Sequence, residues 1–335
     1  MDRRVLLPTS LAPVVPPWEG ERVHELHGLS MGTSWNVKLV APAGFPNTQA
    51  QAGIQATLDR VVREMSNWEP DSDLSRFNHA EPGSWHTLPA GFAQVLACAQ
   101  EVARESEGAF DPTLGTLVEL WGFGPAGSVG APPSVEALQA ARARCAWDAL
   151  TFDSAARRAR QPGGLHLDFS GIAKGFGVDE VARYLAERGI ESYLVEVGGE
   201  LRGQGVKPDG QPWWVALETP PGAEHSAAAQ TVVALHGLSV ASSGDYRRYF
   251  EHAGQRYAHT LDPRTGRPVA HATAQVSVVA ESCMWADALA TALTVLGVDA
   301  GMAYARERGI AALFIQREGG AYREVATPAL LAMAA

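Results

Sequence analysis

The fold is decided by one stretch in the middle of the chain, Leu167-Asp168-Phe169-Ser170-Gly171-Ile172-Ala173-Lys174-Gly175-Phe176-Gly177-Val178-Asp179. We expect an apolar strand over Leu165–Phe169, a glycine-marked turn, and a helix over about Lys174–Arg188. A helix that begins in this way offers unpaired backbone N–H groups and the positive end of its dipole to an anion. Lys174 adds a charge suited to phosphate, and Asp168 stands where the strand ends. The alternative is a plain tight turn with a solvated lysine, since the Walker order of glycines and lysine is absent.

Helical and strand-like patterns mix on both sides of this stretch without a clean repeat. Together they predict an α/β (α+β) chain with a largely antiparallel sheet system and packed helices. The expected helices span Gln49–Met65, Leu88–Glu107, Ser134–Arg144, Ser282–Leu296 and, after Gly297, Asp299–Arg308. One or two strands are expected within His24–Val40, and further strands over Leu150–Phe152, Tyr193–Val197, Trp213–Glu218, Thr231–Leu235, Ala274–Val279 and Ala311–Gln316.

A second candidate site lies on the expected helix Ser282–Leu296. Asp287 and Thr291 are four residues apart, so their side-chain oxygens share one face of that helix. A carboxylate and a hydroxyl among small alanines suit a hard cation such as Mg²⁺. The alternative is an aspartate favoured by the helix dipole and a threonine that bonds back to a helix carbonyl.

A third candidate follows the segment Ser243-Gly244-Asp245-Tyr246, where His259 precedes the turn Asp262-Pro263-Arg264-Thr265-Gly266. A histidine titrates near neutral pH and can act as a general base. The alternative is a hairpin whose histidine only caps or packs. The remaining histidines do not stand at zinc-ligand spacings.

Composition narrows the class of function. The net charge of −10 argues against a nucleic-acid partner and against a polybasic membrane surface. The three cysteines are far apart, which indicates neither a zinc site nor a disulfide framework.

The ends of the chain carry weaker signals. No segment is expected to reach the ~20 apolar residues of a transmembrane helix. Residues 1–22 form an extended lead-in that need not be ordered, because four prolines interrupt any signal-peptide core and no cysteine lies nearby for lipidation. We therefore expect a cytoplasmic protein from the chain as it stands, with a periplasmic one as the alternative if the N-terminus has been trimmed.

The joint order of the motifs is far more specific than any one of them. It resembles the ApbE-type FAD:protein FMN transferases, also called thiamine-biosynthesis lipoproteins, over about residues 28–316. The resemblance implies a T-fold-like architecture in a domain over residues 23–328, a tail over 329–335, FAD as substrate and Mg²⁺ as cofactor. The motifs that carry it are Met31-Gly-Thr, Met65-Ser-x-Trp-x-Pro-x-Ser-x-Leu-Ser-Arg-x-Asn78, Phe110-Asp-Pro-Thr, Asp168-x-x-Gly-x-Ala-Lys-Gly, Val197-Gly-Gly, Ser243-Gly-Asp-Tyr, His259-x-x-Asp-Pro-x-Thr-Gly and Ala286-Asp-Ala-Leu-Ala-Thr.

Carried over position by position, the resemblance implies metal ligation by the side chains of Asp287 and Thr291 and by the backbone carbonyl of Gly171. Trp68 replaces the tyrosine more usual at its position, which preserves stacking and removes a hydroxyl. The residues implied to contact FAD are Met31, Trp68, Ala109, Phe110, Asp111, Asp168, Lys174 and Leu261.

The implied reaction is cleavage of FAD, transfer of FMN to a Ser or Thr hydroxyl of an acceptor protein, and release of AMP. Lys174 and Mg²⁺ would neutralise the phosphates, and His259 or Asp168 would take the hydroxyl proton. The expected acceptor carries a Ser/Thr flavinylation motif and belongs to a redox complex. Two alternatives are an FAD pyrophosphatase that gives FMN and AMP, and a non-enzymatic FAD-binding protein.

Overall fold

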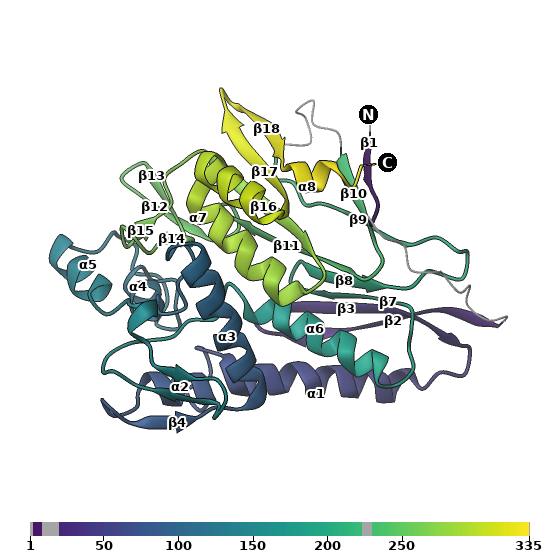
Figure 1. Ribbon diagram of the computed structural model, residues 1–335, viewed down its shortest axis with the longest axis horizontal. Coiled ribbons are helices and arrows are strands. Elements are labelled where there is room, and N and C mark those ends of the chain that lie inside the picture. Colours follow the sequence, from purple (N-terminus) through teal and green to yellow (C-terminus); the bar gives the residue numbers. More distant parts are fainter. Residues whose placement is uncertain (1–2, 9–19, 223–229, 335) are drawn as a thin grey trace.

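An eight-stranded antiparallel sheet forms the centre of the molecule (Figure 1). The structure is a computed structural model that describes residues 3–8, 20–222 and 230–334. The strands lie in the order β18-β17-β16-β11-β8-β7-β3-β2, so the pairing of β8 with β11 joins the N-terminal and C-terminal halves of the chain. They are β2 (Glu21–Ser30), β3 (Thr33–Pro42), β7 (Tyr193–Val197), β8 (Glu200–Gln204), β11 (Leu238–Gly244), β16 (Thr273–Ala280), β17 (Ala311–Glu318) and β18 (Ala321–Ala326).

Helices cover one face of this sheet, with α1, α6 and α7 against the strands and α3 beside them (Figure 1). Side chains alternate along a strand, so Trp35, Val37 and Leu39 of β3 all point to this face. There they pack with Ile54 and Leu58 of α1. The helices are α1 (Asn47–Met65), α2 (Asp73–Asn78), α3 (Ala90–Glu105), α4 (Gly115–Leu120), α5 (Val135–Arg142), α6 (Ala173–Ala186), α7 (Cys283–Arg308) and α8 (Pro328–Leu331).

A second apolar cluster involves residues of the opposite alternation, such as Val40 of β3 and Val279 of β16. They pack with Leu6 and Leu330, from the two ends of the chain. Leu6 lies in β1 (Arg3–Leu6), which pairs in parallel with β10 (Gln230–Leu235), and β10 pairs with β9 (Trp213–Ala216). The described parts of the expected lead-in and C-terminal tail are therefore built into the fold, because their leucines complete this cluster.

Small two- and three-stranded sheets lie outside the central one. The hairpin of β12 (Tyr249–His252) and β13 (Gln255–Ala258) leads directly into β14 (Leu261–Asp262). This short connection contains His259, so the hairpin sets the position of that side chain. The remaining elements are β4 (Trp85–Thr87), β5 (Phe152–Asp153), β6 (Arg158–Arg160), β15 (Arg267–Pro268) and a 3-10 turn over Trp147–Ala149.

The predicted fold class is confirmed: the chain mixes α and β with largely antiparallel sheets and packed helices. The helices that carry a strong apolar stripe, α1, α3 and α6, lie within about two residues of their predicted bounds. Ser134 caps α5 as predicted, since its Oγ accepts a hydrogen bond from the backbone N–H of Ala137 at 3.2 Å.

Helix α7 is divided at the predicted residue. Gly297 has φ 74° and ψ −179° inside the run Cys283–Arg308, so two shorter helices meet there. By length and a mean hydropathy of 1.4 the whole run passes for a membrane-spanning helix, although none is expected from the sequence. In the structure 61% of its apolar window is buried, as in a core helix, and neither half reaches the ~20 residues of a span.

Within His24–Val40 the chain forms the two strands β2 and β3, and Met31 and Gly32 make the two-residue turn between them, with φ of 51° and 71°. One local prediction is wrong. The segment Leu165–Phe169 is not a strand, because side chains occupy backbone groups that a neighbouring strand would use. Asn78 bonds both the N–H of Leu167, at 2.7 Å, and its carbonyl, at 2.9 Å.

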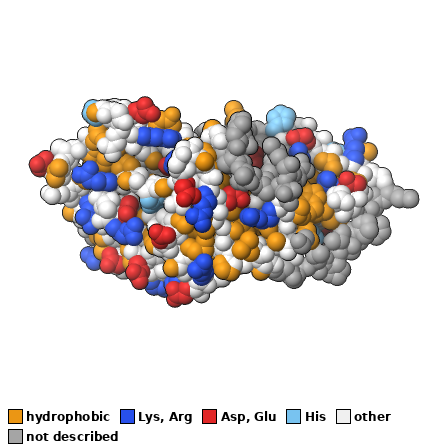
Figure 2. Space-filling model, turned by 90° about the horizontal axis from the view of Figure 1, so that it is seen from above, with side chains coloured by type: hydrophobic (Ala, Val, Ile, Leu, Met, Phe, Trp, Pro, Cys, Tyr) orange, Lys and Arg blue, Asp and Glu red, His pale blue; other side chains and the backbone are white. Residues whose placement is uncertain are grey.

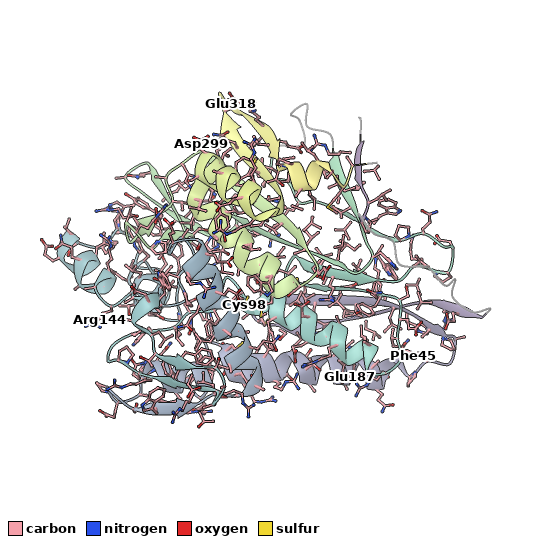
Figure 3. All side chains as sticks on the ribbon, in the orientation of Figure 1. Phe45, Cys98, Arg144, Glu187, Asp299 and Glu318 are labelled. Atoms are coloured by element: carbon pink, nitrogen blue, oxygen red, sulfur yellow. The ribbon has the colours of Figure 1, made fainter. Side chains whose placement is uncertain are left out.

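The side chains sort by charge between interior and surface. Cys98 is buried within the helical layer, whereas Glu187, Asp299 and Glu318 are exposed at its edges and at the end of a hairpin (Figure 3). On the described surface of the face in Figure 2, Lys and Arg side chains are interspersed with Asp and Glu rather than gathered in a strip.

Candidate active site

The site is built around the point where α6 begins against α7. The backbone N–H of Gly175 donates to Oδ2 of Asp287 at 2.9 Å, so the first turn of α6 is tied directly to α7. Glycine is needed here, because a Cβ at position 175 would lie 2.3 Å from the carbonyl oxygen of Cys283. One turn later, Asp179 accepts hydrogen bonds from the side chain of Ser282 and the N–H of Met284 and caps α7. The two helices are thereby fixed relative to one another.

Lys174 lies in the first turn of α6 and forms an ion pair with Glu200, the first residue of β8. The distance from its Nζ to Oε1 of Glu200 is 2.5 Å. Burial acts to lower the pKa of Lys174, but the carboxylates of Glu200 and Asp287 outweigh it and the pKa is raised. Burial raises the pKa of Glu200 to about 7, against the pull of Lys174. The pair therefore places a protonated lysine in the first turn of α6, where the N–H groups of Ala173 and Gly175 already donate to Phe169 and Asp287.

Asp287, Thr291 and Gly171 offer oxygens that fit a hard cation. Asp287 is 4% exposed, and burial raises the pKa of its carboxyl, although the Lys174 ammonium and the hydrogen bond from the Gly175 N–H act to lower it. An ideal Cβ on Gly171 would lie 2.9 Å from Oγ1 of Thr291, so the Gly171 backbone adjoins that hydroxyl.

In the part of the chain that the structure describes, the Thr291 hydroxyl does not bond back to a helix carbonyl, which was the alternative considered for it. Thr294, on the same helix, bonds back to the carbonyl of Ala290 at 2.8 Å, whereas no such bond is formed by Thr291 among the described residues. The described residues hold no cluster of three His, Cys, Asp or Glu side chains that could bind a metal alone. A cation at this place would take its remaining ligands from substrate phosphate and water.

Asp168 stands beside this group and both its carboxylate oxygens are engaged. Oδ2 accepts from the side-chain amide of Asn67 at 2.7 Å, and Oδ1 accepts from the N–H of Ser170 at 2.8 Å. The backbone N–H of Asp168 bonds the carbonyl of Pro112. Asp168 is thus a fixed acceptor that orients the turn before α6.

His259 has the geometry of a neutral base. Its Nδ1 lies 3.1 Å from the carbonyl oxygen of Arg248. A carbonyl only accepts, so Nδ1 carries the hydrogen and Nε2 keeps its lone pair. Burial, together with the positive charges of Arg248 and Lys174, lowers the pKa of His259 to about 4, although the hydrogen bond to the Arg248 carbonyl opposes this. The ring is therefore neutral at pH 7 and near enough to Lys174 to sense its charge.

The other residues implied to contact FAD divide into two groups. Met31 reaches α6, since its Cε would lie 2.9 Å from a Cβ on Gly177. Trp68 is 55% exposed, with the guanidinium of Arg248 6.0 Å from its ring centroid. Phe110 borders the candidate metal ligands, because its ring lies 3.4 Å from the ideal Cβ of Gly171. Met31 and Phe110 thus lie against α6 and the turn before it, and Trp68 lies near the arginine whose carbonyl bonds His259.

The second group, made of Ala109, Asp111 and Leu261, is buried, so its side chains are less available to contact FAD. Ala109 is buried, and the Asp111 carboxylate accepts both hydrogen bonds that Thr113 donates, in a local turn. Leu261 is 4% exposed and packs with Trp121 and other residues of a satellite cluster. Any contact from these positions would come through the backbone or the edge of the side chain.

Sequence reasoning missed three polar residues of the site, Asn67, Glu200 and Arg247. Each follows or lies inside a motif that was recognised: Asn67 between Ser66 and Trp68, Glu200 after Val197-Gly-Gly, and Arg247 after Ser243-Gly-Asp-Tyr. A buried glutamate directly after a Gly-Gly turn was the signal that could have found Glu200.

Taken together, the arrangement combines a lysine at a helix start, side-chain and backbone oxygens that could hold a cation, and a neutral histidine. Such a set can hold a pyrophosphate, neutralise the charge that develops on it and accept a proton from an attacking hydroxyl.

Comparison with known proteins agrees with this chemistry. The profile of the ApbE family matches residues 31–314. An FAD:protein FMN transferase of Vibrio cholerae is 41% identical over 92% of this chain and 91% of its own. That of Haemophilus influenzae is 39% identical over 88% of this chain and 87% of its own. The apo crystal structure of the Pseudomonas stutzeri flavinyl transferase ApbE is 41% identical, with a TM-score of 0.85 over 92% of this chain and 96% of that one.

Proposed function

The chain belongs to the ApbE family of transferases, and we propose that it cleaves FAD and attaches the FMN half to a Ser or Thr hydroxyl of an acceptor protein, releasing AMP. The observation that carries this proposal is the placing of Lys174 and Asp287 together at the start of α6, with a neutral His259 near enough for the Lys174 charge to lower its pKa.

In the proposed reaction the acceptor oxygen forms a bond to the phosphorus of the FMN half. The bond from that phosphorus to the bridging oxygen breaks, and AMP leaves with the bridging oxygen. The hydroxyl proton goes to Nε2 of His259, whose lone pair is available because Nδ1 is bound to the Arg248 carbonyl. His259 suits this role better than Asp168, because both oxygens of Asp168 are already engaged.

The other residues bind and orient the substrate. Lys174 holds the phosphates in line with the attacking oxygen. Asp287, Thr291 and Gly171 hold Mg²⁺, which would supply positive charge to the pyrophosphate in the transition state. Trp68, at the exposed edge of the site, offers a flat face to an aromatic ring of FAD.

The acceptor we propose is a protein of a redox complex that presents its hydroxyl in a flavinylation motif. The test is the intact mass of such an acceptor domain after incubation with this protein, FAD and Mg²⁺. The proposal expects an added FMN mass that disappears with EDTA. An unmodified acceptor together with accumulating FMN and AMP would instead establish a pyrophosphatase, and unchanged FAD would establish a flavin-binding protein.

A further inference from the structure

Glu200 is a buried carboxylate to which none of the implied family roles applies. We propose that Glu200 is a positioning residue, which holds the Lys174 ammonium at the start of α6 for the phosphates of FAD. The inference rests on the proposed function for the identity of the ligand, and on the geometry of the turn before β8 for everything else.

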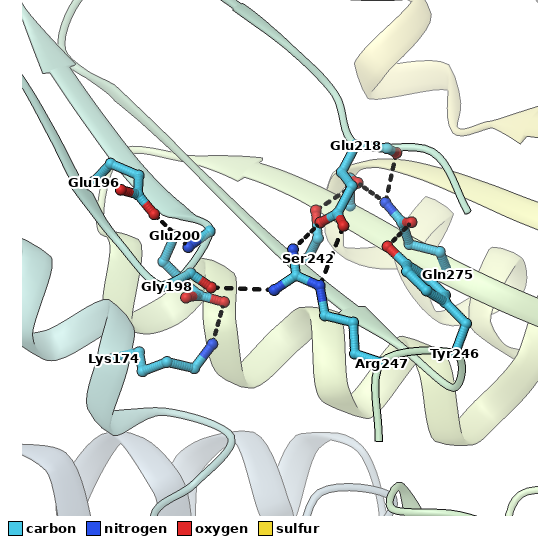
Figure 4. Close-up of polar contacts among 11 residues, drawn as sticks. Lys174, Glu196, Gly198, Glu200, Glu218, Ser242, Tyr246, Arg247 and Gln275 are labelled. Carbon is cyan, nitrogen blue, oxygen red and sulfur yellow. Dashed lines mark hydrogen bonds and ion pairs between the residues drawn. The ribbon is translucent and has the colours of Figure 1, made fainter. Parts of the chain in front are cut away.

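Lys174 lies in the first turn of α6, at the positive end of the helix dipole. The dipole repels its ammonium by about the free energy with which it would stabilise an anion at the same place. Bound phosphate would relieve this repulsion, but only while the ligand is present. Oε1 of Glu200 lies 2.5 Å from Nζ and keeps the ammonium in place without ligand (Figure 4).

The two side chains of this ion pair differ in their exposure to solvent. The Glu200 side chain is 1% exposed, whereas the Lys174 side chain is 30% exposed. Only the lysine of this pair can therefore reach a phosphate. Oε2 of Glu200 has no hydrogen-bond partner among the described residues, so the carboxylate is oriented by its contact with Lys174 alone. Glu200 acts through the lysine rather than on the substrate.

The backbone position of Glu200 is set by the turn that precedes it. It follows the turn Gly198-Gly199, whose φ values of 61° and 103° favour glycine. A Cβ on Gly198 would lie 2.7 Å from Cγ2 of Thr33 and 3.3 Å from Cδ of Lys174, so the turn packs directly on the lysine stem.

Other polar side chains brace this turn from both sides (Figure 4). Oε1 of Glu196 accepts from the N–H of Gly199 at 2.7 Å. Nη1 of Arg247 donates to the carbonyl of Gly198 at 3.2 Å, and the same guanidinium pairs with Glu218. Gln275 in turn donates to the backbone carbonyl of Glu218 at 2.6 Å. The turn is thus fixed independently of Glu200, which leaves the Glu200 carboxylate free to serve Lys174.

The experiment is a double-mutant cycle read by FAD affinity, measured by flavin fluorescence in EDTA so that no turnover is needed. We expect Glu200→Gln to weaken FAD binding about tenfold, the effect of losing one charge-assisted hydrogen bond. In a Lys174→Met background the same change should have no effect, because the lysine that it positions is gone. Glu196→Gln is the matched control: it changes a carboxylate of the same turn that makes no ion pair with Lys174, and affinity should stay within about twofold.

Each other outcome overturns the inference. Tighter FAD binding by Glu200→Gln would show that Glu200 acts only as a repulsive charge beside the phosphates. Equal effects of Glu200→Gln and Glu196→Gln, or additive effects with Lys174→Met, would reduce Glu200 to a structural residue. Glu200→Asp keeps the charge, and so the fold, but shortens the reach. It should also weaken binding, and wild-type affinity in this variant would contradict positioning. Because affinity is measured without acceptor, failure of the transferase reaction would leave this cycle interpretable.

Discussion

The α6–α7 junction and the β12–β13 hairpin hold the two halves of the site in opposite ways. At the junction, buried side chains bond the backbone of a neighbouring helix, as Asp287 does with Gly175 and Asp179 with Met284. The hairpin is a two-stranded ribbon with an exposed outer end, and such ribbons are marginally stable alone.

Aromatic stacking compensates for the weak hairpin. Phe250 and Tyr257 stack with ring centroids 5.0 Å apart, Trp121 stacks on Tyr257, and Phe123 contacts both Phe250 and His259. The difference teaches that the half proposed to bind phosphate is held by hydrogen bonds from buried side chains, while the half proposed to carry the base is held by aromatic packing.

The largest effect is expected from the junction. Asp287→Ala should lower the rate of FMN transfer at least ~10³-fold, because the cation and its charge stabilisation are lost. Asp287→Asn keeps an acceptor for the Gly175 N–H and should lose nearly as much rate with the fold intact. Asp299→Ala, an exposed change on the same helix, should leave the rate unchanged. A rate within tenfold of wild type for Asp287→Asn would remove Asp287 from the metal site.

The hairpin half should show its effect in the chemical step and not in binding. His259→Ala should lower kcat about 10²- to 10³-fold with unchanged FAD affinity, as for loss of a general base. His252→Ala is the control, since His252 lies on the same hairpin and also bonds a carbonyl, that of Gly130. Weaker FAD binding by His259→Ala would place this side chain in the phosphate half.

The pH dependence of kcat tests whether His259 is the base. The base must be unprotonated, and its pKa is lowered from the ordinary 6.5 to about 4. At saturating FAD, where protonation of Glu200 near pH 7 would affect only FAD binding, kcat should therefore stay level as pH falls through 6.5 and decline only near pH 4. An acid limb of kcat near 6.5 would show that the working base is a solvent-exposed histidine instead.

A smaller effect on the rate is expected from Thr291, the second side chain proposed to hold the cation. Thr291→Val should raise the Mg²⁺ concentration for half-maximal rate about tenfold. Thr294→Val removes a hydroxyl that bonds within α7 and should leave the Mg²⁺ requirement unchanged. Equal Mg²⁺ dependence of the two variants would mean that Thr291 does not ligate the cation.

The smallest effect is expected where packing alone supports the base. Phe123→Leu should lower kcat about threefold, because one aromatic contact to His259 is lost. FAD affinity should not change, and a measured change in it would contradict the separation of the two halves.

The sequence predicts features that depend on neighbouring residues better than features that depend on distant ones. The placing of Asp287 and Thr291 on one helix, the helix start near Lys174 and the break at Gly297 were predicted, because helix periodicity and glycine act over a few residues. Glu200 was missed, since its role depends on a lysine 26 positions earlier that only the pairing of β7 and β8 brings near.

Backbone bonding explains the remaining differences. The strand expected over Leu165–Phe169 fails because Asn78, 89 residues away, takes the hydrogen bonds of Leu167. The turn at Met31-Gly32 was hidden because a two-residue hairpin leaves the alternating pattern of its strands almost uninterrupted.

The most direct test of the transferase is the ratio of AMP released to FMN bound, measured in one reaction by chromatography and by intact acceptor mass. We predict one AMP for each FMN attached, with no free FMN and with neither product in Asp287→Asn. AMP and free FMN in equal amounts over an unmodified acceptor would contradict the account.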